Sequence, residues 1–574
     1  MSVLRTSRLW RLQISNFNLP VDKMYKKSFF LFVVLSGLTV SVYAQDTTKR
    51  KTIEITSSFK PVLREAVKIN FNAAPPQADT AKPRLTYNIP AQFLFLTYQP
   101  GEMRPVAFQG DTLKPWENYN YVKVGVGNVH FPFIQTGFTF GDPKTSQFNI
   151  FANHLSSKGS LPSQKNSLTD VTIMGTVKTA NKLEWTGSLG FKNDAYYLYG
   201  YRPDTLKFNE RDLKQFFQTY EGKLALRNTE PTEFGLTYRP NIKVSVFTDN
   251  HSSKASEANT VLNLPLEKTI GKQFGFNLAF TADLTNYRPV APFPNQNNNV
   301  FFVTPAFMVK TSNVNLQASV MPSWDNSQFH LLPNFTADIS TSDQRFGLQL
   351  GWIGYYDKGS YRRYESINPW LAQPGFLLNT RVEERYAGFK GSLDKHFSYA
   401  TKIGFNTYKN MPLFVNDTLV ASGSGGKQFD VLYESSLETL QVHGELSYIQ
   451  GEDFSATASL NYTNFHKLHT EPKAWGLLPL EFNTNLKWRP IKDFWVKADL
   501  FAFDGAQYRA SDGTAFKGDG AFDLNAGVEY RITRQLNLWV QMNDIFNKKY
   551  ERWHQYPVYG FNILGGIVFS FSGK

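Results

Sequence analysis

Two segments of the sequence concentrate tyrosine, arginine and tryptophan, which are the side chains that most often dominate recognition surfaces. They combine rigid apolar area with hydrogen bonding, and therefore suit the binding of a ligand. The same residue types also form aromatic girdles at membrane interfaces, and the sequence supports the two interpretations equally. The candidate recognition residues are Tyr196, Tyr197, Tyr199, Tyr201 and Arg202 in the first segment, and Tyr361, Arg362, Arg363, Tyr364 and Trp370 in the second.

Histidines and carboxylates suggest two further sites, and neither pattern is complete. His443 and Glu445 share one face of a predicted strand, but a third metal ligand is not evident. His466, His469 and Glu471 fall in a predicted loop, where contact with water is the simpler interpretation. We therefore expect no metal site.

Catalytic chemistry has even less support. An enzyme would need a nucleophile beside a base, or a pair of carboxylates at one rim. Lys497 and Asp499 share a strand face, and a structural role is the simpler account. The chain has no cysteine, which excludes disulfides, a thiolate nucleophile and a Cys-ligated metal. We expect no enzymatic activity and no cofactor.

The elements that must position these residues are strands, because apolar and polar residues alternate from Tyr119 to Phe571. The polar face is mostly Gly, Ser, Thr, Asn and Gln, as in a barrel lumen, rather than the Lys and Glu of a soluble sheet. In residues 274–284, one face holds Phe274, Phe276, Leu278, Phe280 and Leu284, and the other holds Gly275, Asn277, Ala279, Thr281 and Asp283. In residues 536–543, one face holds Leu536, Leu538, Val540 and Met542, and the other holds Asn537, Trp539, Gln541 and Asn543.

Short turns alternate with long loops along this region, which is the arrangement of a membrane barrel. The candidate recognition residues all fall in loops of the long set, at 194–213 and 354–381. Tracing the hairpins predicts an all-β fold, a large antiparallel transmembrane β-barrel over 119–574, of about 22 strands within a range of roughly 16 to 22.

Composition agrees with a wall between lipid and water. Aromatic residues make up 15% of the 574 residues, yet the mean hydropathy of −0.36 is too polar for a bundle of membrane helices. The net charge is +13, with basic residues scattered rather than gathered beside stacking aromatics, so nucleic acid is not an expected partner. Anionic outer-membrane lipid and lipopolysaccharide are the expected partners of these charges.

The region before the barrel divides into three parts. Residues 24–44 predict a signal peptide, with Lys26 and Lys27 before an apolar core and small residues before Gln45. Residues 1–23 are then an over-long start. Residues 45–118 are rich in proline, which lacks the donor that a barrel wall needs, and predict a short N-terminal periplasmic extension. A disordered linker is the alternative for this part.

The C-terminal strand, residues 559–571, alternates and ends in aromatic residues. Together with residues 536–558 it resembles the end of TonB-dependent receptor barrels. Residues 59–69, 120–128, 429–449 and 496–500 resemble a related family of Bacteroidetes, and the resemblance extends over nearly all of 45–571. It implies a receptor-like barrel of the cell outer membrane. Residues 45–118 are too few for the plug domain of a full receptor.

This resemblance implies transport or reception of a scarce extracellular small ligand of unknown identity, with TonB or another envelope protein as partner. Thr52, Ile53, Glu54, Ile55 and Thr56 are a candidate TonB-box-like segment, for which a local strand is the alternative. The alternative function is a non-energised outer-membrane barrel that serves as scaffold or subunit of an envelope complex.

Overall fold

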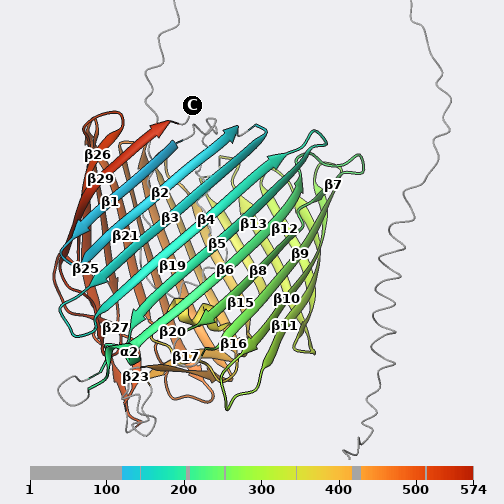
Figure 1. Cartoon of the computed structure of the whole chain (residues 1–574). Coiled ribbons are helices and arrows are strands. Elements are labelled where there is room, and N and C mark those ends of the chain that lie inside the picture. Colours follow the sequence, from blue (N-terminus) through green and yellow to red (C-terminus); the bar gives the residue numbers. More distant parts are fainter. Residues whose placement is uncertain are drawn as a thin grey trace, which may run out of the picture. The chain divides into compact units, whose positions relative to one another are not determined.

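The computed structural model describes residues 119–572, apart from Pro143, 202–206, 251–253, Gln344, 417–427 and 511–512. The predicted extension and the candidate segment Thr52–Thr56 lie outside the described residues. Antiparallel strands make up 70% of the described part, which is almost free of helix (Figure 1). The wall strands are β1 (Tyr119–Gly127), β2 (His130–Asp142), β3 (Ser146–Lys158), β4 (Lys165–Lys178), β5 (Leu183–Tyr197), β6 (Lys214–Asn228), β7 (Leu236–Tyr238), β8 (Asn241–Asp249), β9 (Ser256–Ile270), β10 (Phe274–Arg288), β11 (Gln296–Lys310), β12 (Val314–Asp325), β13 (Gln328–Ser340), β14 (Gly347–Asp357), β15 (Thr380–Ser392), β16 (Phe397–Lys409), β19 (Leu437–Gln450), β20 (Phe454–Leu468), β21 (Leu480–Ile491), β22 (Phe494–Phe503), β25 (Ala521–Arg531), β26 (Leu536–Asn543) and β29 (Asn562–Ser572).

The wall closes on itself, because β1 pairs with β29 from Tyr119↔Ser572 to Gly127↔Leu564. β7 and β8 both pair with β9 and are two pieces of one strand, separated where Pro240 lacks a backbone donor. Counting them once gives a closed barrel of 22 antiparallel strands, so the predicted fold class and strand number are confirmed.

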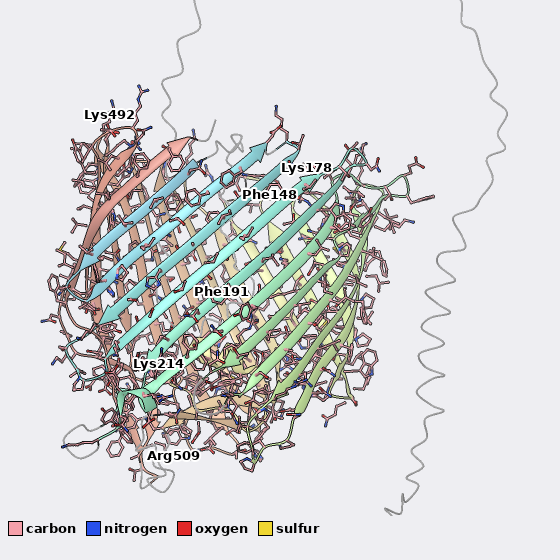
Figure 2. The ribbon with its side chains drawn as sticks, in the orientation of Figure 1. Phe148, Lys178, Phe191, Lys214, Lys492 and Arg509 are labelled. Atoms are coloured by element: carbon pink, nitrogen blue, oxygen red, sulfur yellow. The ribbon has the colours of Figure 1, made fainter. Side chains whose placement is uncertain are left out.

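The two faces of the wall differ as the alternation predicts. On β10 the exposed fractions of Phe274, Phe276 and Leu278 are 45%, 41% and 39%, although the barrel is folded, because these rings point outward. Figure 2 shows Phe148 in this outer surface, with Lys178 and Lys492 near one end of the barrel and Lys214 and Arg509 near the other. An apolar band between positive ends suits a bilayer with anionic head groups.

Large rings on the inner face lie over glycines of nearby strands. A Cβ atom on Gly125 would approach the Trp539 ring to 2.5 Å, and one on Gly137 would approach the Tyr121 ring to 2.4 Å. The same holds for Gly351 beneath the Tyr386 ring, at 2.2 Å. These ring-over-glycine contacts cover backbone that a glycine leaves bare, and they fix the register of the strands.

The two ends of the barrel carry different connections. Short turns lie at the end where β29 finishes, and longer loops lie at the other end (Figure 1), so the latter is the extracellular mouth. Within the described residues, no helix is long and apolar enough to cross a bilayer. The loop elements are α2 (Glu210–Leu213), α3 (Tyr361–Ile367), β17 (Met411–Asn416), β18 (Phe429–Glu434), β23 (Gln507–Arg509), β24 (Ala515–Lys517), β27 (Glu551–Trp553) and β28 (Tyr556–Pro557).

The strands reach further into the predicted loops than the alternation indicates. Tyr196 and Tyr197 are the last residues of β5, and His466 lies on β20, so their predicted loop positions are wrong. The reason is that strand pairing continues beyond the membrane, where both faces meet water or other loops and the alternation fades.

Candidate functional site at the extracellular mouth

The mouth is crossed by the connection between β14 and β15, residues 358–379, which we call the cap. Its centre is α3, which begins after Ser360, whose hydroxyl accepts a hydrogen bond from the Arg363 backbone N–H at 3.3 Å. The cap contacts β6 through the ring of Phe217 against Tyr361, and β5 through the Trp370 indole N–H, which donates to the Tyr197 carbonyl at 3.1 Å. A loop that leaves the wall at β14 and contacts β5 and β6 must lie across the opening.

One buried carboxylate on the wall fastens the start of α3. Glu257 of β9 is 2% exposed, and its two oxygens accept from the Ser360 hydroxyl at 2.5 Å and the Tyr361 backbone N–H at 2.6 Å. The Tyr361 hydroxyl donates to Asp249 of β8 at 2.8 Å. Charge-assisted bonds of this kind are stronger than neutral ones, so they hold the cap inside the mouth.

An amide network joins both legs of the cap to the wall. The Asn298 side chain of β11 donates to the Gly359 carbonyl at 3.0 Å, and the Gly359 N–H donates to the Asn379 side chain at 3.0 Å. Lys358 donates to the Asn298 carbonyl at 2.6 Å and forms an ion pair with Asp283 at 3.2 Å. The legs are so close that a Cβ atom on Gly359 would lie 2.1 Å from the Leu378 carbonyl oxygen, which requires glycine there.

Aromatic side chains from separate loops pack into a cluster beneath the cap. The Trp370 ring stacks on Tyr556 of β28 with centroids 4.0 Å apart, and Tyr199 meets Tyr556 edge-on at 4.9 Å. Tyr361 and Tyr364 are fully buried, and Phe217 and Phe247 belong to the same core. Other buried members are Tyr196, Ala255, Tyr287, Ile367, Leu371, Leu377, Phe414, Phe429 and Trp553. Burial of this much apolar area stabilises the cap.

A carboxyl group is buried with the cap. Glu365 of α3 is 3% exposed, and burial raises its pKa to about 8, while the positive charge of Lys192 offsets only part of this effect. Asp194 and Asp249 add negative charge nearby, which favours the neutral form further. The Glu365 carboxyl therefore holds its proton at neutral pH.

A second buried carboxylate organises the neighbouring loop. Glu434, at the end of β18, accepts backbone N–H bonds from Ser436 at 3.0 Å, His469 at 3.0 Å, Thr470 at 2.9 Å and Glu471 at 2.6 Å. Burial opposes its ionisation, but these donors together lower its pKa below the ordinary value. The sequence gives no signal for Glu434, because His469, Thr470 and Glu471 lie more than thirty residues away along the chain.

The structure places most of the predicted recognition residues in or beside the cap. Tyr196, Tyr199, Tyr361, Tyr364 and Trp370 meet in the aromatic cluster, where Tyr361 and Tyr364 have no exposed surface. These rings pack against each other, so they hold the cap together. Their role in binding a ligand stays a prediction.

The remaining candidates lie at the edges of the cluster. Arg362 donates to Glu221 of β6 at 2.9 Å, and Arg363 forms an ion pair with Asp357. Tyr197 lies beneath the Lys165 ammonium at 4.5 Å, and Tyr201 packs on Phe208 with centroids 5.0 Å apart. Arg202 lies outside the described residues. Both arginines of the second segment therefore serve the attachment of the cap.

The titratable candidates are dispersed. His443 bonds to the Asn461 side chain at 2.7 Å, and His466 faces Glu438 at 3.7 Å. His469 lies 3.5 Å from the Ser435 hydroxyl, and the Glu471 carboxylate accepts from the Trp475 indole. In the part of the chain that the structure describes, no three His, Asp or Glu side chains gather as metal ligands.

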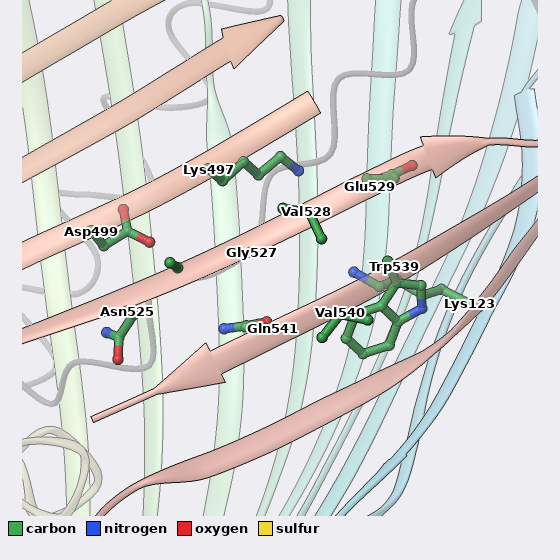
Figure 3. Close-up of a pocket in the computed structure, with 11 residues that line it drawn as sticks. Lys123, Lys497, Asp499, Asn525, Gly527, Val528, Glu529, Trp539, Val540 and Gln541 are labelled. Carbon is green, nitrogen blue, oxygen red and sulfur yellow. The ribbon is translucent and has the colours of Figure 1, made fainter. Parts of the chain in front are cut away.

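A small hollow on the inner wall lies near the periplasmic ends of four strands (Figure 3). Lys497 and Asp499 of β22 line it with Glu529 of β25 and Trp539 of β26, and Lys123 of β1 lies 4.1 Å above the Trp539 ring. The hollow presents both signs of charge and a flat ring toward the lumen. Such a surface suits contact with a polypeptide or a polar solute more than catalysis.

The fold and the mouth together define a large outer-membrane β-barrel with loops packed into its opening. No protein-family model matches the sequence, and no curated protein matches it. Solved structures are similar in fold.

The FrpB iron transporter from Neisseria meningitidis is 10% identical with a TM-score of 0.62, over 79% of this chain and 82% of that chain. The ferric enterobactin receptor PfeA from Pseudomonas aeruginosa, in complex with enterobactin, is 10% identical with a TM-score of 0.60, over 79% and 81%. The siderophore receptor PirA from the same organism is 11% identical with a TM-score of 0.55, over 80% and 81%. At this identity the likeness is one of fold.

Proposed function

We propose that this chain is an outer-membrane receptor or transporter that captures a scarce small ligand at its extracellular mouth and passes it inward. The observation that carries the proposal is the cap, which crosses the opening and is fastened by Glu257, Asp249 and Asn298. A general diffusion pore would leave its mouth open to solutes. A fastened cap instead makes entry depend on contacts between the solute and the loops.

The similar structures supply the second support. They are an iron transporter and two siderophore receptors, whose barrels have this fold. The resemblance at the C-terminal strand points to the same class. We also propose that residues 45–118 take the place of a separate plug domain. We further propose that basic residues near the two ends of the barrel contact lipid and lipopolysaccharide.

Transport is tested by what cells remove from their medium. Cells with the protein and cells lacking its gene are grown on the same spent medium, and small solutes are compared by mass spectrometry. We expect at least one solute to be depleted faster by cells with the protein, and a protonophore to abolish the difference. Equal depletion of every solute would support the alternative of a non-energised barrel that serves an envelope complex.

Energy coupling is tested at the candidate segment Thr52–Thr56. The chain has no cysteine, so a Glu54→Cys substitution gives a single thiol. We expect that thiol to cross-link to TonB carrying an engineered cysteine, and an added Ile55→Pro substitution to abolish the cross-link by breaking the extended pairing. Cross-linking that survives Ile55→Pro, or none in either chain, would remove TonB from the proposal.

A further inference from the structure

A second opening lies beside the cap, between the β17–β18, β23–β24 and β27–β28 hairpins. It has a volume of about 100 Å³. Three aromatic side chains, Phe414, Phe429 and Trp553, line one side, and Tyr508 and His554 stack on the other with centroids 3.7 Å apart. We call it the loop pocket. Its remaining lining residues are Gly476, Ala506, Gln507, Gly518, Asp519, Lys549, Glu551 and Arg552.

Two buried donors line the loop pocket without an acceptor. The Arg552 Nε and the Trp553 indole Nε1 have no hydrogen-bond partner among the described residues, and Trp553 is only 3% exposed. Adjacent buried N–H groups left unpaired are costly, and native structures rarely keep them without a partner. An oxygen ligand that accepts from both would remove this cost.

The charge of Arg552 is compensated only in part. Its Nη1 donates to the Gly476 carbonyl at 3.1 Å, and its guanidinium lies 4.2 Å from the Trp553 ring, but in the described part of the chain it forms no ion pair. Burial lowers its pKa to about 10, although Glu481 lies near enough to oppose this effect. Glu481 acts on Arg552 without contacting it, so the guanidinium keeps N–H donors that an oxyanion could accept from.

The carboxylates that line the pocket do not supply that anion. Glu551 accepts from the Gln555 backbone N–H at 2.7 Å and lies 3.3 Å from the His554 ring nitrogen. Asp519 is exposed at the rim, as is Lys549, so the two rim charges are solvated and of opposite sign. The pocket therefore combines aromatic walls with the N–H donors of Arg552 and Trp553, and the Glu551 carboxylate is held by Gln555 and His554.

We infer that the loop pocket binds a small organic anion, whose carboxylate or phosphate accepts from Arg552 and Trp553 while its apolar part lies between the aromatic walls. The inference rests on the proposed function, because it names the ligand chemistry of the same mouth. Guanidinium groups bind either oxyanion through paired N–H donors. Aromatic walls favour a ligand with a ring or a short apolar chain.

The test is equilibrium binding to the full chain in detergent, measured by isothermal titration calorimetry with benzoate, inorganic phosphate and neutral benzamide. We expect saturable binding of benzoate or phosphate, and none of benzamide. Arg552→Gln should weaken binding at least about tenfold, and Trp553→Phe, which removes the indole N–H together with part of the ring wall, about threefold or more. Arg509→Gln, in the same loop cluster but outside the pocket lining, should leave binding unchanged.

Folding of each variant is checked by the shift in gel mobility that heating causes in an intact barrel. Absence of saturable binding by both anions, equal binding of benzamide, or equal loss in Arg509→Gln would overturn the inference. The calorimetric test measures binding and not uptake, so it can succeed where the uptake test fails. If the protein binds an anion but cells deplete no solute, the loop pocket inference stands and the proposed transport is refuted. Benzoate binding without phosphate binding would assign the ligand to the carboxylates, and the reverse to the phosphates.

Discussion

Among single residues, Asp544 has an ionisation that is tied to the position of a loop. It follows β26, and its backbone N–H donates to Asn525 at 3.1 Å, while its carboxyl accepts from the Tyr550 hydroxyl at 3.3 Å. Burial raises the pKa of Asp544 to about 7, and the negative charge of Asp523 adds to the effect. Asp523 itself accepts from the Phe546 backbone N–H at 3.0 Å, so both carboxyls hold the same loop.

The packing of this loop should therefore depend on pH. The folded pKa of Asp544 lies above its ordinary value of 3.8, so the packed loop is most stable below about pH 4 and loses stability as pH rises to about 7. Asp544→Asn should remove this dependence. The measurement is the rate of hydrogen exchange at the Phe546 amide. The ratio of this rate in the wild type to the rate in the variant should rise between pH 5 and 8. A constant ratio would contradict the assigned protonation.

Glu434 gives a second prediction for a single residue. Its carboxylate accepts from four backbone N–H groups, including those of His469 and Glu471. Glu434→Gln should lower the free energy of local opening at residues 469–471 by about 1–3 kcal/mol, seen as faster hydrogen exchange. Glu438→Gln is the matched control, because Glu438 forms a surface ion pair with Lys467. Equal exchange in both variants would show that Glu434 does not organise this loop.

The cap is the element that the proposed function makes responsible for entry to the lumen, and its attachment to β9 is concentrated in Glu257. Loss of that carboxylate leaves the Ser360 hydroxyl and the Tyr361 N–H without a strong acceptor inside the mouth. The aromatic cluster and the bonds from Tyr361 to Asp249 and from Arg362 to Glu221 then have to hold α3. Undocking of α3 would expose Ile367, which is 6% exposed in the structure.

Docking of the cap can be followed by thiol labelling of an Ile367→Cys variant, since the chain has no other cysteine. In this background Glu257→Ala should raise the rate of maleimide labelling at least about tenfold, because local opening becomes easier by more than about 1.4 kcal/mol. Glu267→Ala, at the far end of the same strand, is the control and should not change the rate. A cap that labels equally in both variants is not held by Glu257.

At the scale of the whole molecule, the barrel could be predicted from the sequence because its cause is local. A period of two places Phe274 and Phe276 on one face whatever their neighbours are. The packing of the mouth has no such local cause. Trp370 meets Tyr556, and Gln164 donates to the Pro557 carbonyl across most of the chain, through contacts that only barrel closure brings together.

The candidate site was predictable in part for the same reason. Clusters of Tyr and Arg drew attention to loops that meet at the mouth, and their role in recognition stays a prediction. The sequence did not predict that Tyr361 is buried or that Arg552 lines the loop pocket. Burial depends on which loops meet. The one sequence feature that points to Arg552 as a binding residue is its context. It is a single arginine next to Trp553 and close to His554 in a long loop.

The last prediction concerns how the whole barrel is closed to ions. A barrel of 22 strands encloses a wide lumen, and the cap covers only its extracellular end. We propose that residues 45–118 act as the plug of this barrel. Deletion of residues 45–118 should turn a nearly closed protein into a conducting pore in planar bilayers. The isolated 45–118 peptide, added from the periplasmic side, should close it again, whereas a scrambled peptide should not. If the deletion leaves the conductance unchanged, this segment does not act as a plug, and the loops alone must close the mouth.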